Sequence, residues 1–199
     1  MSKKPSHSNT LRIIGGQWKG RRLRFPTVPG LRPTPDRVRE TLFNWLMFDI
    51  PGARCLDGFA GSGALGLEAL SRGATHLVFI DTSEKSVQAI KQHLATLACF
   101  NADVIHTKAD KYLKHQQKPF DIVFLDPPFR KGLLKPVLDA LYTLERVKIS
   151  SKIYIEVEQE FDEQSLPSWL DVIKKKQAGD VSYLLAEVNA TDSSMFIKT

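Results

Sequence analysis

Residues 55–74 read CLDGFAGSGALGLEALSRGA, and this stretch decides which kind of fold the chain can adopt. The apolar residues that lead into Asp57 are typical of a buried strand, and the segment from Ala64 onward has helical character. Between them, residues 61–66 match the G-x-G-x-x-G pattern of a loop that approaches a ligand closely. Strand, glycine loop and helix in this order predict one unit of a parallel α/β fold.

The rest of the chain continues this alternation. The pattern predicts further strands at 76–81, 102–106, 120–126 and 152–159, and helices at 64–73, 83–98, 112–117 and 133–147. Two last strands, at 170–179 and 181–188, lie close together and predict an antiparallel hairpin at the sheet edge. We therefore expect an α/β fold with an open, mostly parallel, doubly wound sheet.

The N-terminal region predicts a small extension of this fold. Residues 11–14 supply a first strand, Gly15 and Gly16 a turn, and residues 18–25 a second, basic strand of a β-hairpin. A helix then follows, with Thr34 as its N-cap and Pro35 at its first position. We place the boundary here, with residues 1–33 as a basic arm and residues 34–199 as the main domain.

The charge of the chain is concentrated in this arm. Residues 1–39 carry ten Lys and Arg against Asp36 alone, whereas the remaining 160 residues carry 18 basic and 21 acidic side chains. This asymmetry is typical of proteins that bind nucleic acid, although a solvated tail would also carry charge. The candidate phosphate contacts are Arg12, Lys19, Arg21, Arg22, Arg24, Arg32, Arg37 and Arg39.

Composition indicates a globular protein without a membrane span. Hydrophobic residues make up 42% of the chain, and no apolar run approaches the roughly 18 residues that a span requires. The N-terminus shows no secretory signal, so we expect a cytoplasmic protein, and by default a monomer. Cys55 and Cys99 predict buried, reduced thiols, and the scattered histidines give no support to a metal site.

Four aspartates stand at or just beyond predicted strand ends, where open α/β sheets bind their ligands. Asp81 could accept hydrogen bonds from the ribose hydroxyls of either NAD or S-adenosylmethionine, and Asp110 follows the next strand. Asp57 distinguishes the two ligands, because its charge would oppose a pyrophosphate but attract the ammonium group of a methionine moiety. Asp57 could instead simply cap its own loop.

The stretch FDIVFLDPPFRKG, residues 120–132, predicts the reacting site. Asp126 ends a buried strand, and the two prolines after it prevent the chain from continuing as a ladder or a helix. The Asp126 carboxylate and the Pro127 carbonyl would then form a pair of acceptors that suits an amine with two N–H donors. Phe129 offers a flat face on which a base could stack.

The Asp57 loop, Asp81 and DPPF together resemble class I S-adenosylmethionine-dependent methyltransferases that act on amino groups. Four stretches resemble more closely the bacterial RsmD family, which methylates the exocyclic amine of a guanine in small-subunit ribosomal RNA. These stretches are RIIGGQWKGRRL, LRPTPDRVRETLFNWL, CLDGFAGSGALGLEALSRGA and VFLDPPFRKGLL, with a weaker likeness in KKKQAGDVSYLL. One departure is Asp81, where members of the family often carry Glu.

The resemblance implies a Rossmann-like class I methyltransferase fold and a role for each site residue. The cofactor S-adenosylmethionine would lie against Asp57, Phe59, Ala60, Gly61, Ser62, Gly63, Asp81, Thr82 and Asp110, with Asp110 near the adenine amine. Asp126, Pro127 and Phe129 would hold the target base, and the basic arm would bind the RNA. The chemistry at DPPF leaves open an adenine-N6 methyltransferase acting on DNA or another RNA. A protein glutamine methyltransferase, an NAD-dependent oxidoreductase and a non-catalytic RNA-binding protein fit the residues less well.

Overall fold

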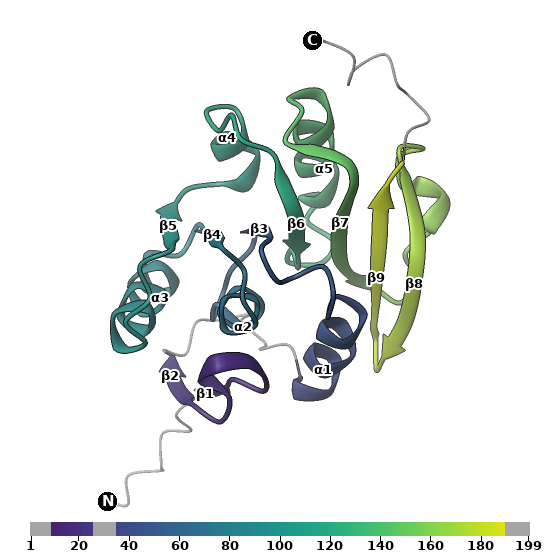
Figure 1. The fold of residues 1–199 in the computed structure, drawn as a ribbon. Helices are drawn as coiled ribbons and strands as arrows, with labels where there is room; N and C mark the ends of the chain where they lie inside the picture. Colours follow the sequence, from purple (N-terminus) through teal and green to yellow (C-terminus); the bar gives the residue numbers. More distant parts are fainter. Residues whose placement is uncertain (1–8, 26–34, 190–199) are drawn as a thin grey trace, which may run out of the picture.

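A seven-stranded sheet forms the centre of the protein in a computed structural model that describes residues 9–25 and 35–189 (Figure 1). The strand order is β5-β4-β3-β6-β7-β9-β8. The five strands from β5 to β7 run parallel, and β9 runs antiparallel to both of its neighbours. The strands are β3 (Arg54–Asp57), β4 (His76–Asp81), β5 (Ala102–His106), β6 (Phe120–Leu125), β7 (Val147–Glu158), β8 (Leu170–Ala178) and β9 (Val181–Val188). The predicted fold class, with its antiparallel hairpin at the edge, is confirmed.

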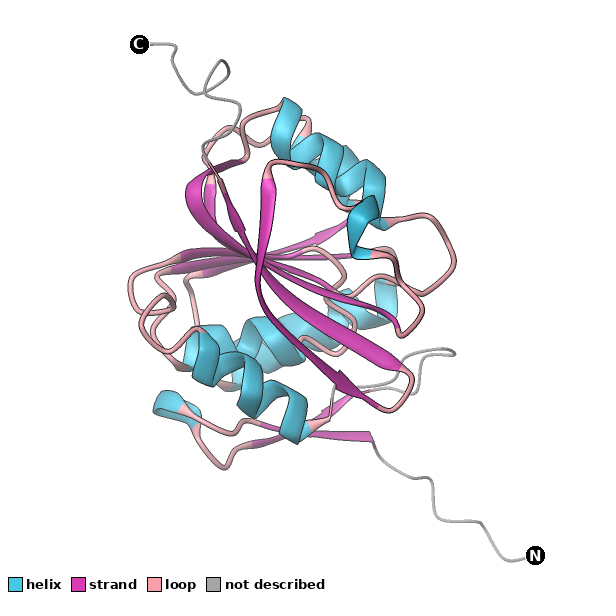
Figure 2. Cartoon of the chain, turned by 90° about the vertical axis from the view of Figure 1, so that its right-hand side faces the viewer, coloured by secondary structure: helices cyan, strands magenta, loops and turns pink. Residues whose placement is uncertain are grey.

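Helices cover both faces of this twisted sheet, as a doubly wound fold requires (Figure 2). One face is covered by α1 (Asp36–Trp45), α2 (Ala64–Ser71) and α3 (Glu84–Thr96). The other is covered by α4 (Ala109–Leu113) and α5 (Leu134–Thr143). Alternate residues of the central strands pack into opposite layers: Cys55 of β3 belongs to the first core and Leu56 to the second.

The N-terminal hairpin packs beneath α2 and α3 and pairs β1 (Asn9–Arg12) with β2 (Arg22–Phe25). The second strand begins later than the predicted residue 18, because a 3-10 turn, η1 (Gly16–Trp18), comes first. This turn lies directly against α2: a side chain at Gly16, which has a φ of +73°, would meet the Ser71 carbonyl at 1.8 Å. Ser71 Oγ accepts a hydrogen bond from the Trp18 amide and donates one to the Gly15 carbonyl. Tertiary contact therefore overrides the local strand pattern.

Two other boundaries differ from the sequence pattern. The N-cap of α1 is Pro35 rather than Thr34, which lies outside the described residues. Strand β7 begins at Val147, which the pattern assigns to the preceding helix, and reaches its main register with β6 only after an irregularity around Ser150, which has a φ of +70°. A short 3-10 helix, η2 (Glu163–Ser165), connects β7 to β8.

Other expectations concern the interior and the surface. Both cysteines are buried and unpaired, as predicted. Within the described ranges, no helix is both long enough and apolar enough to cross a membrane. The same residues contain no cluster of His, Cys, Asp or Glu that could hold a metal ion.

Candidate active site and nucleic-acid interface

A cavity of about 840 Å³ opens at the carboxyl edge of the parallel strands. The loops that follow β3, β4, β5 and β6 line it, as the switch point of an open α/β sheet predicts. The start of α1, the beginning of α5, Glu156 of β7 and the β8–β9 turn (residues 178–181) also line it. The predicted residues that meet in this one cavity are Asp57, Phe59, Ala60, Gly61, Ser62, Asp81, Thr82, Asp110, Asp126, Pro127 and Phe129.

The glycine loop turns the chain sharply into α2. Gly61 and Gly63 have φ values of +53° and +79°, in the left-handed region that disfavours other residues. Gly63 caps α2 and is absent from the cavity wall, because its α-carbon faces Ile90 and Leu67. Its function is therefore to shape the loop, and direct contact with a cofactor is not supported by its position.

Asp81 is fixed at the end of β4 by two backbone amides. Its Oδ2 accepts a hydrogen bond of 2.7 Å from the Gly61 amide, and its Oδ1 accepts one of 2.7 Å from the Ser83 amide. A carboxylate has about four acceptor positions, so these bonds orient Asp81 without using all of its capacity. The side chain can therefore also accept from a diol bound in the cavity.

Asp57 is only 3% exposed, and its Oδ2 accepts a hydrogen bond of 3.1 Å from the Gly66 amide. The carboxylate thus does cap its own loop, while it also lines the cavity. The pKa of Asp57 is raised to about 7, mainly by burial and in smaller part by the charges of Asp81 and Glu156, although backbone hydrogen bonds act to lower it. A bound cation would reverse this effect, because it favours the ionised form.

Asp126 and the prolines after it line the cavity at the end of β6, the strand that pairs with β3. Burial raises the pKa of Asp126 well above its usual range, and the charges of Glu156 and Asp57 add to the shift. Pro127 is buried, whereas Phe129 is half-buried and faces the cavity. The arrangement can receive a planar amine at one end of the same cavity that holds the glycine loop.

Glu156 is a cavity residue that the sequence analysis missed. It lies near the end of β7, is 6% exposed and accepts a hydrogen bond of 2.9 Å from Tyr154 Oη. The sequence held only a weak signal, a glutamate within the apolar run IYIEV, and Lys152 four residues earlier offered an ordinary partner for it. Only the parallel pairing of β6 with β7 shows that this position lies beside Asp126.

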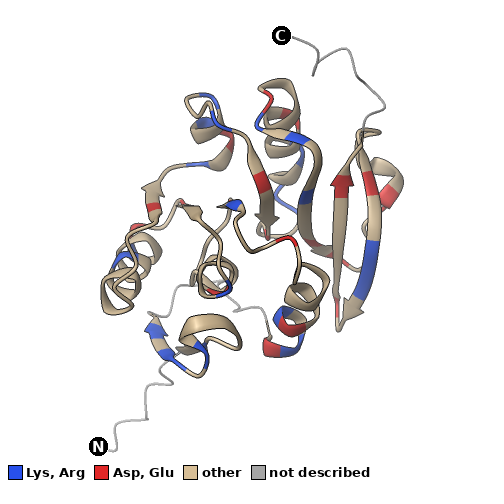
Figure 3. Cartoon of the chain, viewed as in Figure 1, with Lys and Arg blue, Asp and Glu red and all other residues tan. Residues whose placement is uncertain are grey.

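The basic side chains of the hairpin form one exposed group. Figure 3 shows basic residues along the hairpin and at the start of α1, at the same end of the molecule as the cavity rim at Pro35. The exposed members are Arg12, Lys19, Arg21, Arg22, Arg24 and Arg37. Arg32 falls outside the described residues.

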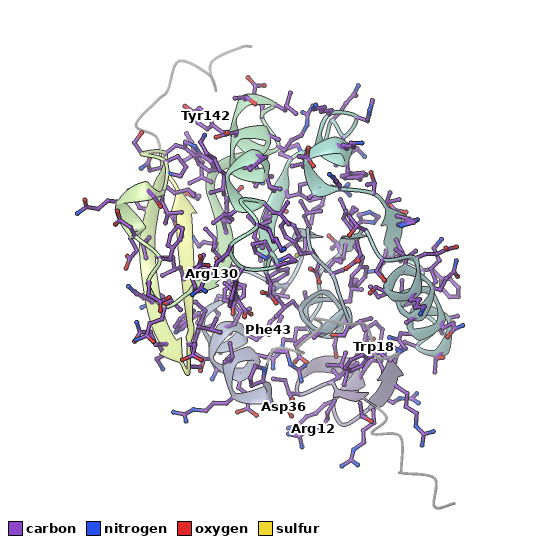
Figure 4. All side chains as sticks on the ribbon, turned by 180° about the vertical axis from the view of Figure 1, so that it is seen from behind. Arg12, Trp18, Asp36, Phe43, Arg130 and Tyr142 are labelled. Atoms are coloured by element: carbon purple, nitrogen blue, oxygen red, sulfur yellow. The ribbon has the colours of Figure 1, made fainter. Side chains whose placement is uncertain are left out.

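Arg39 differs from this group and corrects one expectation. It is 1% exposed and donates a hydrogen bond of 2.8 Å to the Arg12 carbonyl. Asp36 pairs with Arg39 at 2.5 Å and with the exposed Arg12 at 3.0 Å, and Figure 4 shows Arg12 beside Asp36. The Arg39 side chain therefore makes its interactions inside the protein, where it is inaccessible to RNA phosphates.

The residues of the cavity fit S-adenosylmethionine. Asp81 offers acceptors for a ribose, and Asp57 offers an acid for an ammonium group. The carboxylates of the cavity, which include Asp57, Asp81, Asp126 and Glu156, favour a ligand of net positive charge. The same carboxylates would oppose the pyrophosphate of NAD. Fold and site together define a class I methyltransferase that depends on S-adenosylmethionine.

Comparison with known proteins agrees with this class. Residues 11–187 match the family model described as Conserved hypothetical protein 95. The chain is 47% identical to ribosomal RNA small subunit methyltransferase D of Escherichia coli (strain K12), over 96% of this chain and 98% of that protein. It is 43% identical to the protein of the same name from Haemophilus influenzae, over 91% of this chain and 95% of that one.

A solved structure, that of the protein yhhF from Escherichia coli, shares the fold with a TM-score of 0.81. It is 47% identical and covers 91% of this chain and 99% of its own. The chain belongs to the ribosomal RNA small subunit methyltransferase D family.

Proposed function

We propose that this protein transfers a methyl group from S-adenosylmethionine to the N2 amine of a guanine in small-subunit ribosomal RNA. The observation that carries the proposal is the position of Asp126 and Pro127 in the same cavity as the glycine loop and Asp81. A cofactor site and an acceptor pair for an amine therefore share one space.

Residues of the glycine loop would hold the cofactor. Asp57 would lie beside the methionine ammonium, Asp81 would accept from the ribose hydroxyls, and Asp110 would lie near the adenine. Residues 59–62 would approach the ligand through their backbone. When it is bound, S-adenosylmethionine supplies a methyl group already activated by its sulfonium, so orientation is the main task left to the protein.

Asp126 would orient the target amine. The lone pair of a guanine N2 amine is delocalised into the ring, so the free amine is a poor nucleophile. Hydrogen bonds from its two N–H groups to the Asp126 carboxylate and the Pro127 carbonyl would turn that lone pair out of conjugation. The same bonds would stabilise the positive charge that develops on nitrogen, while Phe129 stacks on the base.

The exposed basic side chains of the hairpin and α1 would hold the RNA. Contacts of this kind bind phosphates and position the substrate but read little sequence. The target base must leave its stack to reach the cavity, as in other enzymes that act on a base. The division into an RNA-binding arm, residues 1–33, and a methyltransferase domain, residues 34–199, belongs to this proposal, although the hairpin shares a hydrophobic core with α1–α3. We further propose that the protein acts as a cytoplasmic monomer.

Transfer of labelled methyl groups would test the function. The substrates are naked small-subunit RNA, small subunits from a strain lacking the enzyme, transfer RNA and duplex DNA, each digested afterwards to identify the modified base. Label in N2-methylguanine from small-subunit RNA is the expected result, and the better of the two ribosomal substrates identifies the assembly stage. Label in N6-methyladenine would overturn the choice of substrate, and absence of label in every substrate would overturn the enzymatic proposal.

A further inference from the structure

Glu156 lies directly beside the acceptor pair. In the parallel pairing of β6 with β7, Leu125, the last residue of β6, stands opposite Ile155, so Asp126 and Glu156 follow at the next position along each chain segment. Both residues line the main cavity. The charge of Glu156 also raises the cost of ionising Asp126, because it adds to the effect of burial in raising the pKa of Asp126.

Tyr154 orients the Glu156 carboxylate. The two residues lie two positions apart on β7 and therefore share one face of the sheet. Tyr154 is fully buried between the rings of Phe124 and Tyr183, and its Oη donates a hydrogen bond of 2.9 Å to Glu156 Oε1. A carboxylate held in this way can still accept further hydrogen bonds.

The group beside the amine is what distinguishes guanine from adenine. In guanine the N2 amine is adjacent to N1–H, which is a donor, whereas in adenine the N6 amine is adjacent to N1, which is an acceptor. Asp126 and Pro127 suit either amine and so cannot choose between the bases. An anionic acceptor next to them would accept from guanine N1–H and repel the lone pair of adenine N1.

We propose that Glu156 determines the specificity for guanine by accepting the N1–H hydrogen bond of the target base. The inference rests on the proposed function and adds to it the feature that selects the base. Tyr154 satisfies one acceptor position of this carboxylate, and burial among two other acids makes a further donor favourable. A bound guanine supplies that donor, whereas adenine would leave the carboxylate facing a lone pair, and sites built on such a bond reject mismatched substrates strongly.

Methyl transfer to different target bases tests the role of Glu156. Small-subunit particles are reconstituted with guanine, adenine or 1-methylguanine at the modified position, and methyl transfer is measured for wild type, Glu156→Gln and Glu156→Ala. The Gln amide can rotate to donate to adenine N1, so we expect E156Q to lower the guanine-to-adenine ratio of kcat/KM by at least about 100-fold. E156A should accept 1-methylguanine, which lacks N1–H, about as well as guanine, whereas wild type should reject it.

Glu158 provides a matched control on the same strand. It borders a neighbouring cavity of about 400 Å³ and not the main one, so Glu158→Gln should keep the wild-type ratio. Cofactor affinity and melting temperature, measured on each variant, separate loss of fold from loss of selectivity. An unchanged ratio in folded E156Q would overturn the role of Glu156. Failure of wild type to methylate guanine would instead overturn the proposed function.

A second inference concerns the lysines of β8, which the sheet register divides between two faces. Lys174 and Lys176 stand opposite Leu185 and Tyr183 of β9, whereas Lys175 stands opposite Leu184. The Tyr183 ring lies 5.6 Å from the ring of Trp45 in α1, so Lys174 and Lys176 are on the α1 face. Lys175 is on the other face and pairs with Glu163.

The C-terminal end of β8, on the side of the sheet that α1 covers, lies next to the opening of the cavity. Strand β8 continues into the turn whose residues 178–181 line the cavity, and Pro35 and Val38 at the start of α1 line it too. Figure 3 shows the lysines of β8 and the basic residues of α1 and the hairpin as separate groups at this end of the molecule. We infer that Lys174 and Lys176 contact phosphates of the substrate RNA on the side of the mouth opposite the hairpin.

The salt dependence of binding to small-subunit RNA distinguishes the contribution of Lys174 and Lys176 from that of Lys175. Each phosphate contact contributes about 0.7–0.9 to the slope of log K against log salt, so K174A/K176A should lower the slope by about 1.5. Lys175→Ala should leave the slope unchanged, because its charge is already paired. An equal effect of both variants, or none from the double variant, would overturn the inference. Absence of RNA binding by the wild type would count against the proposed function itself.

Discussion

The guanidinium of Arg39 lies 3.6 Å from the carboxylate of Glu68, with the two side chains 1% and 0% exposed. Arg39 belongs to α1, which borders the cavity, and Glu68 to α2, which follows the glycine loop. Glu68 also accepts hydrogen bonds from the Ile14 amide at 2.9 Å and from Arg72 at 2.7 Å. One buried acid of α2 therefore links the hairpin, α1 and α2.

Removal of this acid should destabilise the protein. Glu68→Ala removes the ion pair with the buried Arg39, which keeps its contacts with Asp36 and the Arg12 carbonyl, and leaves the Ile14 amide without its acceptor. Breaking a buried pair typically costs about 3–5 kcal/mol. Urea unfolding would measure the change in the free energy of unfolding. As a control, Asp139→Asn breaks the exposed pair with Lys135, for which we expect less than about 1 kcal/mol. A loss below about 1 kcal/mol in Glu68→Ala would show that this junction contributes little.

This junction also shows what the sequence could not predict. Strand and helix periodicity identified the order of elements, because alternation of apolar residues is a local property of the chain. Glu68 and Arg39 look like surface residues in that pattern, and α2 is nonetheless buried along its whole length. Their pairing depends on how the hairpin packs against α2, which is a contact between residues 54 positions apart at Ile14 and Glu68.

The candidate site also contains both residues that the sequence could predict and residues that it could not. Asp57, Asp81 and Asp126 were predictable because parallel strands bring their carboxyl ends to one edge of the sheet. Glu156 was not, since its relation to Asp126 depends on the register of β7 after an irregularity near Ser150. Arg39 was misjudged for a related reason, because charge alone does not tell whether an arginine faces phosphate or a buried partner.

Cofactor affinity should depend on pH through Asp57. Its pKa in the ligand-free protein is raised from 3.8 to about 7, so the group is mostly protonated below pH 7. An ammonium group needs the ionised form, so affinity should fall by up to about tenfold for each pH unit below 7. Calorimetric titration with S-adenosylmethionine between pH 5.5 and 7.5 would measure this slope.

Two variants show whether Asp57 is the source of that slope. Asp57→Asn keeps an acceptor for the Gly66 amide but cannot ionise, so affinity should be weak and nearly independent of pH over this range. Asp103→Asn, on β5 outside the cavity, should behave as the wild type. Retention of the full slope in Asp57→Asn would assign the pH dependence to another acid of the cavity.

Loss of Asp126 should separate catalysis from cofactor binding. Asp126→Ala removes an acceptor that orients the amine and stabilises the charge that develops on it, and losses of about 10²–10³ in kcat are typical for such groups. The dissociation constant for S-adenosylmethionine should change much less, because Asp57 and Asp81 remain in place. Single-turnover methyl transfer and calorimetry would measure the two quantities. Activity within tenfold of the wild type would contradict the role given to Asp126.

Stacking on Phe129 should contribute to binding of the target base. The side chain is half-buried at the cavity wall, so Phe129→Leu keeps apolar volume but removes the flat face. Base stacking on an aromatic ring is worth about 1–3 kcal/mol, which corresponds to a loss of roughly 5- to 150-fold in kcat/KM. Steady-state kinetics with small-subunit RNA would show it, and an unchanged kcat/KM would place the base elsewhere.

The hairpin arginines should contribute to RNA binding through their charge. Arg22 and Arg24 are exposed on β2, and Arg22→Ala with Arg24→Ala should lower the slope of log K against log salt for small-subunit RNA by about 1.5, or about 0.7–0.9 for each contact. The loss should be similar for RNAs of unrelated sequence, because phosphate contacts read no bases. Lys111→Ala with Lys114→Ala removes the same charge from α4, far from the hairpin in Figure 1, and should leave the slope unchanged. If both double variants lowered the slope equally, net charge alone would account for binding and the hairpin would have no special part in it.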